Sequence, residues 1–128
     1  MDFPEDLFYT KTHEWVKKEG DNKVRVGITS YAQSELGDVV YIELPDLDRI
    51  VKAGTACTVV ESVKAAFDIY APVSGKVIET NNDLENNPQL VNENPYGKGW
   101  FSIIEMEDPQ ELTKLLSNKD YEKLCQSK

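Results

Sequence analysis

The chain has 128 residues and a formal net charge of −9, with 23 acidic side chains against 14 basic ones. This length predicts one domain, residues 1–128, which can bury a core without disulfide or metal staples. The negative charge argues against nucleic acid and anionic membrane surfaces as partners, and it either steers protein partners or only maintains solubility.

The first half of the chain alternates short apolar runs with turn signals. Residues 12–18 and 23–28 predict two antiparallel strands joined by a Gly-Asp-Asn turn. Residues 30–37 predict a short helix that is capped by Ser30, and residues 38–44 predict the next strand.

The second half contains the clearest hairpin signal. A polar stretch at 61–65 lies between two apolar runs, which predicts two antiparallel strands and a tight turn. A strand over 76–79, a loop over 81–99 and a last strand over 100–106 follow, and helices are expected from Asp108 onward. The chain therefore predicts a mainly β fold of two antiparallel sheets with short helices, including C-terminal helices.

The cysteine usage and the ends of the chain bear on the compartment. Cys57 and Cys125 lie far apart, so free thiols in a reducing compartment are expected, and a zinc site is not. No segment is long and apolar enough to span a membrane, and the N-terminus lacks a secretory or transit signal. We therefore expect a cytoplasmic protein, or the mature form of one that lost a targeting segment, for instance in the mitochondrial matrix.

The hairpin places Lys64 at or beside its tip. A lysine on a turn is either an ordinary solvated side chain or an amine that another enzyme can acylate. A Schiff base on Lys64 would require burial or a neighbouring cation, and the nearby Glu61 supplies neither. The single histidine, His13, precedes Glu14 in a predicted strand, where the two point to opposite faces. We therefore expect no catalytic constellation.

The residues around Lys64 carry a family resemblance. The sequence Glu-Ser-Val-Lys-Ala at 61–65, followed by Asp68 and by Ala-Pro-Val-Ser-Gly at 71–75, resembles the lipoylation site of the glycine cleavage H-protein family. Related lipoyl domains usually carry Asp-Lys-Ala at this turn, and biotin carriers carry Met-Lys-Met. Blocks that match the same family are His13–Val16, Gly27–Thr29, Tyr31–Gln33, Leu36–Val40, Glu43–Pro45, Asn87–Pro88, Leu90–Asn92, Pro95–Gly97 and Gly99–Trp100.

The resemblance implies a fold and a function. The fold would be a barrel-sandwich hybrid with the modified lysine on a hairpin, and Lys64 would carry lipoate in amide linkage. The protein would then be a non-catalytic carrier of the glycine cleavage system, shuttling an aminomethyl group. Its implied partners are the pyridoxal-phosphate glycine decarboxylase, the aminomethyltransferase, dihydrolipoamide dehydrogenase and lipoate-attaching enzymes.

The resemblance also implies roles for residues around the arm. Glu14 would pair with the amine of the loaded arm, with Thr12 and Asp68 as hydrogen-bonding neighbours. Glu61 and Asp68 would guide the lipoylating enzyme, and Gly75 would set the position of the hairpin. Two residues depart from the family: Phe67 replaces a small polar residue, and Thr12 stands where serine is common.

Other functions stay open on the sequence. An H-like protein that relays lipoyl or octanoyl groups to other lipoyl domains needs the same hairpin. A biotin carrier is disfavoured, since no methionine flanks Lys64. An enzyme that uses Lys64 or His13 would turn over substrate alone, and a purely structural or regulatory module would leave Lys64 unmodified.

Overall fold

The computed structural model describes residues 3–127. The strands are β1 (Phe8–Tyr9), β2 (Glu14–Lys18), β3 (Lys23–Ile28), β4 (Val39–Glu43), β5 (Ile50–Val51), β6 (Ala56–Ser62), β7 (Ala66–Tyr70), β8 (Gly75–Thr80) and β9 (Ser102–Met106). The helices are α1 (Ser30–Leu36), α2 (Asp83–Asn86), α3 (Leu90–Glu93), the 3-10 helix η1 (Pro109–Lys114) and α4 (Asn118–Gln126).

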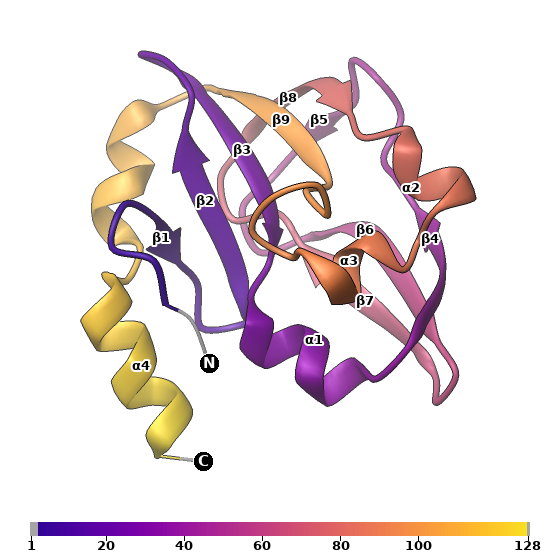
Figure 1. Cartoon of the computed structure of the whole chain (residues 1–128). Helices are drawn as coiled ribbons and strands as arrows, with labels where there is room; N and C mark the ends of the chain where they lie inside the picture. The colour runs from indigo at the N-terminus through magenta and orange to yellow at the C-terminus, as the bar shows by residue number, and fades with distance from the viewer. Residues whose placement is uncertain (1–2, 128) are drawn as a thin grey trace.

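The strands form two antiparallel sheets, as the sequence predicts. One has six strands in the order β1-β2-β3-β9-β8-β5, and the other has three in the order β4-β6-β7 (Figure 1). Neither sheet closes into a barrel within the described residues. The mainly β sandwich is confirmed, and β7 lies at an edge of the small sheet.

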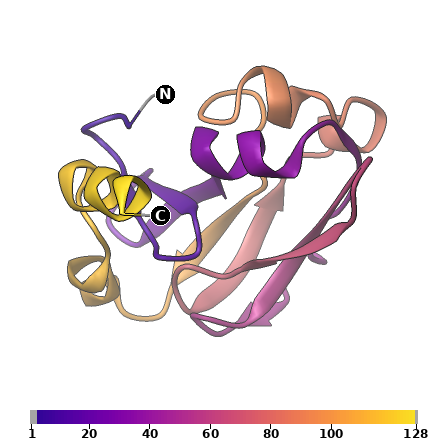
Figure 2. The ribbon, with the colours of Figure 1, turned by 90° about the horizontal axis from the view of Figure 1, so that it is seen from below.

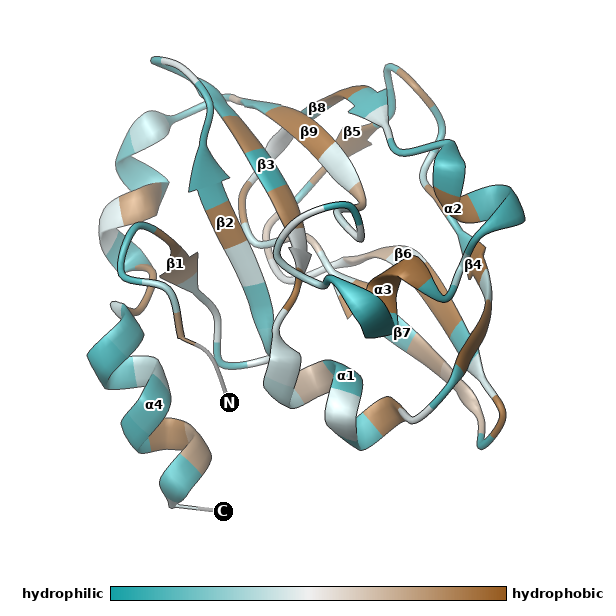
Figure 3. Cartoon of the chain, viewed as in Figure 1, coloured by the Kyte–Doolittle hydropathy of each residue, from teal (hydrophilic) through white to brown (hydrophobic). Residues whose placement is uncertain are grey.

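The core lies between the sheets. Strands of the large sheet alternate apolar and polar residues, as β3 shows in Figure 3, and they bury Val24, Val26 and their neighbours. The small sheet contributes Ile42, Val60 and Ile69 to a second cluster that includes residues of α1, α2 and α3. The inner face of the β6–β7 hairpin is therefore buried while its tip projects away from the core (Figures 1 and 2).

The C-terminal helix packs on the N-terminal strands. Tyr121 of α4 and Tyr9 of β1 are fully buried, with ring centroids 4.7 Å apart and an interplanar angle of 4°. Just before α4, the backbone of Leu116 exchanges two hydrogen bonds with Tyr9, at 2.7 and 2.9 Å. This cluster joins residues more than 100 positions apart in sequence.

Three local predictions need correction. The cap of α1 is Thr29, whose hydroxyl accepts the N–H of Ala32, and not Ser30. The strand expected over 12–18 begins at Glu14, because His13 adopts the left-handed conformation with φ 77°. The segment 81–99, predicted as loop, contains α2 and α3, which form because their single turns bury Leu84 and Val91 in the core.

Other expectations agree with the structure. Cys57 and Cys125 are both free, and Cys57 is buried. Within residues 3–127, no helix has the length and apolar character needed to cross a membrane.

Candidate functional site

The turn that carries Lys64 is fixed by local hydrogen bonds. The Ser62 N–H donates to the Ala65 carbonyl at 2.9 Å, and the Ser62 hydroxyl accepts the N–H groups of Lys64 at 3.1 Å and Ala65 at 3.4 Å. The Val63 N–H donates to the carbonyl of Asp38 at 3.0 Å, which ties the tip to the start of β4. These bonds hold the backbone of the turn in one conformation, so the point at which the Lys64 side chain begins is fixed.

Lys64 lies at the tip, as predicted, and is exposed. Its Nζ donates to the backbone carbonyl of Glu35 at 3.4 Å, at the C-terminal end of α1, where helix carbonyls favour a cation. Gly37 ends this helix with φ +80°, and a Cβ at Gly37 would lie 3.3 Å from Cε of Lys64. A glycine here thus lets the aliphatic stem of Lys64 lie close to the backbone.

Two hollows follow the edge strand β7 away from Lys64. The first, of about 300 Å³, is lined by Thr12, His13, Tyr31, Ala32, Glu35, Leu36, Phe67, Asp68 and Ile69. The second, of about 360 Å³, is lined by Thr10, Thr12, Glu14, Gly54, Tyr70, Ala71 and Pro72. The two hollows share Thr12 and are lined by consecutive residues of β7 and its continuation, so we refer to them together as the β7 groove. Lys64 lines neither hollow, but its amine contacts the carbonyl of Glu35, which lines the first hollow; we call this end of the groove its mouth.

A buried carboxylate lies at the far end of the β7 groove. Glu14 is only 2% exposed, and its Oε1 accepts the hydroxyls of Thr10 at 2.6 Å and Thr12 at 2.5 Å. Its Oε2 accepts the Tyr70 N–H at 3.4 Å. Burial raises the pKa of Glu14 above its ordinary value, and these hydrogen bonds only partly oppose that shift. Within residues 3–127 no basic side chain forms an ion pair with Glu14, so this carboxylate is a natural partner for a bound cation.

Of the other predicted site residues, Thr12 and Asp68 line the groove, and Glu61 lies on the outer face of the small sheet. Thr12 contacts Glu14 directly, and Asp68 lines the groove. Glu61 pairs in register with Tyr41 and Ala66, so it lies on the face of the sheet that points away from the core. The structure thus brings Glu14, Thr12 and Asp68 to one groove, and it places Glu61 beside the hairpin tip.

Gly75 belongs to the other sheet. It lies on β8 opposite Met106, and a Cβ at this position would come within 2.0 Å of the Glu105 carbonyl oxygen. The absence of a side chain is therefore required by the close approach of β8 and β9.

Three residues of the site escaped the sequence prediction. Ser62 fixes the turn, and a serine that opens a turn is a recognisable signal for such bonds. Thr10 and the backbone of Tyr70 hold Glu14, and no local pattern announces either contact.

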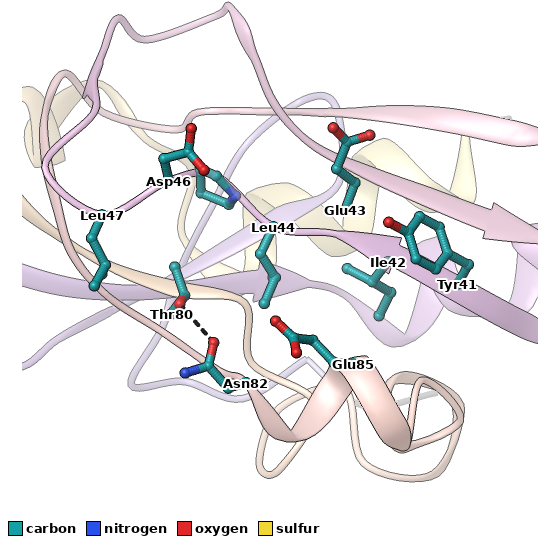
Figure 4. Close-up of a pocket in the computed structure, with 10 residues that line it drawn as sticks. Tyr41, Ile42, Glu43, Leu44, Asp46, Leu47, Thr80, Asn82 and Glu85 are labelled. Atoms are coloured by element: carbon teal, nitrogen blue, oxygen red, sulfur yellow. Dashed lines mark hydrogen bonds between the residues drawn. The ribbon is translucent and has the colours of Figure 1, made fainter.

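A further hollow, of about 500 Å³, lies on the other side of the small sheet, between β4 and α2 (Figure 4). The carboxylates of Glu43, Asp46 and Glu85 line it, and Thr80 and Asn82 are joined there by a 3.2 Å hydrogen bond. Among the described residues, no cluster of histidine, cysteine and acidic side chains could hold a metal ion.

The comparison with known proteins decides the family. Residues 7–128 match the family model described as glycine cleavage H-protein. The chain belongs to the glycine cleavage H-protein family. It is 52% identical over 126 residues to a glycine cleavage system H protein of Xylella fastidiosa, covering 98% of this chain and 96% of the relative. It is 54% identical over 127 residues to one of Thermus thermophilus, covering 99% of this chain and 98% of that relative.

A solved structure supports the same family. The crystal structure of a glycine cleavage system H protein from Mycobacterium marinum superimposes with a TM-score of 0.83 at 37% sequence identity, covering 92% of this chain and 94% of that one. The family resemblance read from the residues around Lys64 is therefore confirmed over almost the whole chain.

The residues at the hairpin fit a lipoyl group in this H-protein family member. The amine of Lys64 is exposed, and the groove near it has apolar side chains, Phe67, Ile69 and Pro72, that suit an aliphatic arm. The groove ends at the buried carboxylate of Glu14. These residues suit a group that is apolar along its length and carries a positive charge at its free end.

Proposed function

We propose that the protein is a lipoyl carrier of the glycine cleavage system, with lipoate in amide linkage to Lys64. The observation that carries this proposal is the exposed amine of Lys64, which contacts Glu35 beside a groove that ends at the buried carboxylate of Glu14. Residues 1–128 act together as one carrier domain in this proposal. The bacterial relatives favour a cytoplasmic location.

The dimensions of the β7 groove support the proposal. Pro72 lies five positions after Phe67, and an extended chain rises about 3.3 Å per residue, so the groove extends for roughly 17 Å. A lipoyl-lysine side chain has about 12 bonds in line, which at about 1.2 Å per bond is comparable in length. The arm can therefore be sheltered within this chain, and it can also leave the groove and reach out from the hairpin.

Specific residues would hold the arm and its cargo. The side chains of Phe67 and Ile69 would contact the aliphatic part of the arm. Glu14 would pair with the cationic amine of the aminomethyl cargo, while Thr10 and Thr12 keep the carboxylate oriented. Asp68 would be a second hydrogen-bonding neighbour. Excluding water from the cargo slows its hydrolysis during transfer between enzymes.

The protein would act as a substrate that visits other enzymes. The lipoyl group supplies a dithiolane that can be reduced and reoxidised, and the tether raises its effective concentration at each visited site. The visited enzymes would be the pyridoxal-phosphate glycine decarboxylase, the aminomethyltransferase and dihydrolipoamide dehydrogenase. Lipoate-attaching enzymes would modify Lys64 beforehand, with Glu61 and Asp68 as recognition candidates, while Gly75 would act only indirectly, by setting the position of the hairpin.

Attachment is tested by mass spectrometry. Purified protein is incubated with a lipoate ligase, lipoate and ATP, and the intact mass and the tryptic peptides are measured. We expect one lipoyl adduct per chain, on the peptide that contains Lys64. An unmodified Lys64 under conditions that modify a known lipoyl domain would refute the carrier function.

The role of Glu14 is tested by the lifetime of the loaded arm. Lipoylated wild type and Glu14→Ala are loaded with the aminomethyl group, and release of ammonia and formaldehyde is followed. We expect faster release from Glu14→Ala. The matched control is Glu43→Ala, which removes an exposed carboxylate that lies outside the β7 groove. Equal lifetimes for wild type and Glu14→Ala would contradict the proposed role.

A further inference from the structure

The C-terminal helix contacts His13, which lines the first hollow of the β7 groove, through one hydroxyl. Tyr121 of α4 is fully buried, and its OH lies 2.7 Å from Nδ1 of His13 and 2.6 Å from the Thr29 hydroxyl. His13 stands between Thr12 and Glu14 in sequence. A side chain 108 positions downstream therefore contacts the turn that shapes the carboxylate site.

The turn at His13 has an unusual backbone conformation. His13 has φ 77°, in the left-handed region, which costs a non-glycine residue about 1–2 kcal/mol. Its N–H donates to the Thr10 carbonyl at 3.2 Å, and its carbonyl accepts the Thr29 N–H at 3.1 Å. This fold-back brings Thr10 and Thr12 to the same oxygen of Glu14. The geometry of the carboxylate site thus depends on keeping His13 in this conformation.

The hydroxyl hydrogens of Thr29 and Tyr121 can be placed so that every hydrogen bond in this group has one donor and one acceptor. The Thr29 oxygen accepts the Ala32 N–H at 3.2 Å as the cap of α1, which leaves its hydrogen free to donate to the Tyr121 oxygen. Tyr121 can then donate to Nδ1 of His13. In this arrangement each hydroxyl donates once, and the imidazole accepts at Nδ1. The His13 ring also packs against Tyr31, with centroids 4.8 Å apart.

We propose that Tyr121 and His13 are positioning residues for Glu14, through which the C-terminal helix holds the Thr10–Glu14 turn in the shape that keeps this carboxylate buried and hydrogen-bonded. Neither residue has to touch the cargo. The effect on the carboxylate can be measured on the unmodified chain, whereas the effect on a loaded arm rests on the proposed function. Tyr121→Phe removes the hydroxyl and keeps the ring, so it isolates this contact.

The chain offers a closely matched control. Tyr9 is also fully buried and stacks on Tyr121, but its hydroxyl donates to the Pro4 carbonyl at 2.7 Å and so has a partner other than His13 and Thr29. Tyr9→Phe therefore removes a hydroxyl from the same aromatic cluster without touching the proposed connection. Differences between the two variants report on positioning and not on general stability.

The first measurement uses the unmodified protein. The pKa of Glu14 is determined by NMR titration of its side-chain carboxyl in wild type, Tyr121→Phe and Tyr9→Phe. Since burial is the main cause of the raised pKa, we expect Tyr121→Phe to lower it toward the ordinary glutamate value. We expect Tyr9→Phe to leave it unchanged. An unchanged or higher value in Tyr121→Phe, or an equal fall in Tyr9→Phe, overturns the proposal.

A second variant guards against a folding defect in Tyr121→Phe. His13→Gly adopts the left-handed conformation without a Cβ penalty, and it removes the imidazole that the Tyr121 hydroxyl contacts. We expect it to lower the Glu14 pKa by the same amount. The double variant should show no further change, because both substitutions remove one shared hydrogen bond. Additive shifts overturn the connection between the two residues.

The second measurement separates this inference from the proposed function. Lipoylated proteins are loaded, and the decay of the aminomethyl arm is compared with that of free aminomethyl-dihydrolipoamide. If the wild type gives no protection, the sheltering function fails. If the wild type protects the arm and Tyr121→Phe protects it equally, the positioning role fails. We expect several-fold faster decay for Tyr121→Phe and the wild-type rate for Tyr9→Phe.

Discussion

The amine of Lys64 lies 3.4 Å from the backbone carbonyl oxygen of Glu35, at the C-terminal end of α1. This contact holds the unmodified side chain over the end of the helix and beside the mouth of the β7 groove. Acylation converts the ammonium into a neutral amide and removes the charge that the helix end favours. In the proposed function, modification would therefore weaken the contact of this side chain with α1 and allow the longer, uncharged arm to enter the groove.

Lys64→Arg should keep the fold and lose lipoylation. Arginine retains the positive charge near the carbonyl of Glu35, so we expect the free energy of unfolding to change by less than about 0.5 kcal/mol. The guanidinium is no nucleophile for the activated acyl group, so no lipoyl adduct should form. Urea unfolding and intact mass test the two parts, and an adduct on another lysine would contradict the second.

Glu14→Gln should change how stability depends on pH. Burial raises the folded-state pKa of Glu14 above its unfolded value of about 4.3, so the folded protein favours the protonated form. The corresponding stability is present below the unfolded pKa and is lost as pH rises through the higher folded value. The wild type should therefore lose stability relative to Glu14→Gln as pH rises above about 4.

The measurement for Glu14→Gln is the midpoint of urea unfolding, followed from about pH 3.5 upward so that it begins below the unfolded pKa. We expect the two curves to separate with rising pH and then run parallel above the folded pKa. Curves that stay parallel throughout would show that Glu14 titrates alike in the folded and unfolded chains. Burial of the ionised Glu14 carboxylate would then cost no folding free energy before cargo binds.

Gly75→Ala should destabilise the large sheet. A Cβ at Gly75 would lie 2.0 Å from the Glu105 carbonyl oxygen, so β8 and β9 would have to move apart. We expect a loss of about 2–3 kcal/mol in the free energy of unfolding. Gly20→Ala is the control, since a Cβ there meets nothing within 4 Å, and it should cost less than about 0.5 kcal/mol. Equal stability of the two variants would show that β8 and β9 can move apart at little cost in free energy.

Val63→Ser should slow modification of its neighbour. Val63 is 69% exposed beside Lys64, so an enzyme that binds Lys64 would bury this apolar side chain. Loss of about 1.5 kcal/mol of binding corresponds to a fall of about tenfold in kcat/KM for lipoylation. Ile50→Ser removes a comparably apolar side chain, 59% exposed, from the other sheet and should leave the rate unchanged. Equal rates for all three proteins would exclude Val63 from the contact.

The sequence predicted the hairpin and the two sheets because these depend on local patterns. Alternating apolar residues predict strands, and the polar stretch between two apolar runs predicts the turn that bears Lys64. The short helices over 81–99 escaped because four-residue turns have no periodicity to detect. They form where Leu84 and Val91 meet an existing core.

The polar contacts of the site could not be predicted from the sequence. Thr10 and Thr12 meet Glu14 only because His13 takes the left-handed conformation, which no apolar pattern announces. Tyr121 reaches the same turn from the other end of the chain. Contacts between residues so far apart in sequence follow from how the aromatic cluster packs, and a single sequence does not encode that packing in any short motif.

The Ser62 hydroxyl accepts the N–H groups of Lys64 and Ala65, and it thereby fixes the backbone from which the arm would extend. All the freedom of the arm then lies in its own single bonds, and the backbone beneath it adds almost none. In the proposed function, the reactive end of the arm would explore the space within one arm's length of this anchored point. Reaching the next enzyme would then require diffusion and rotation of the whole molecule.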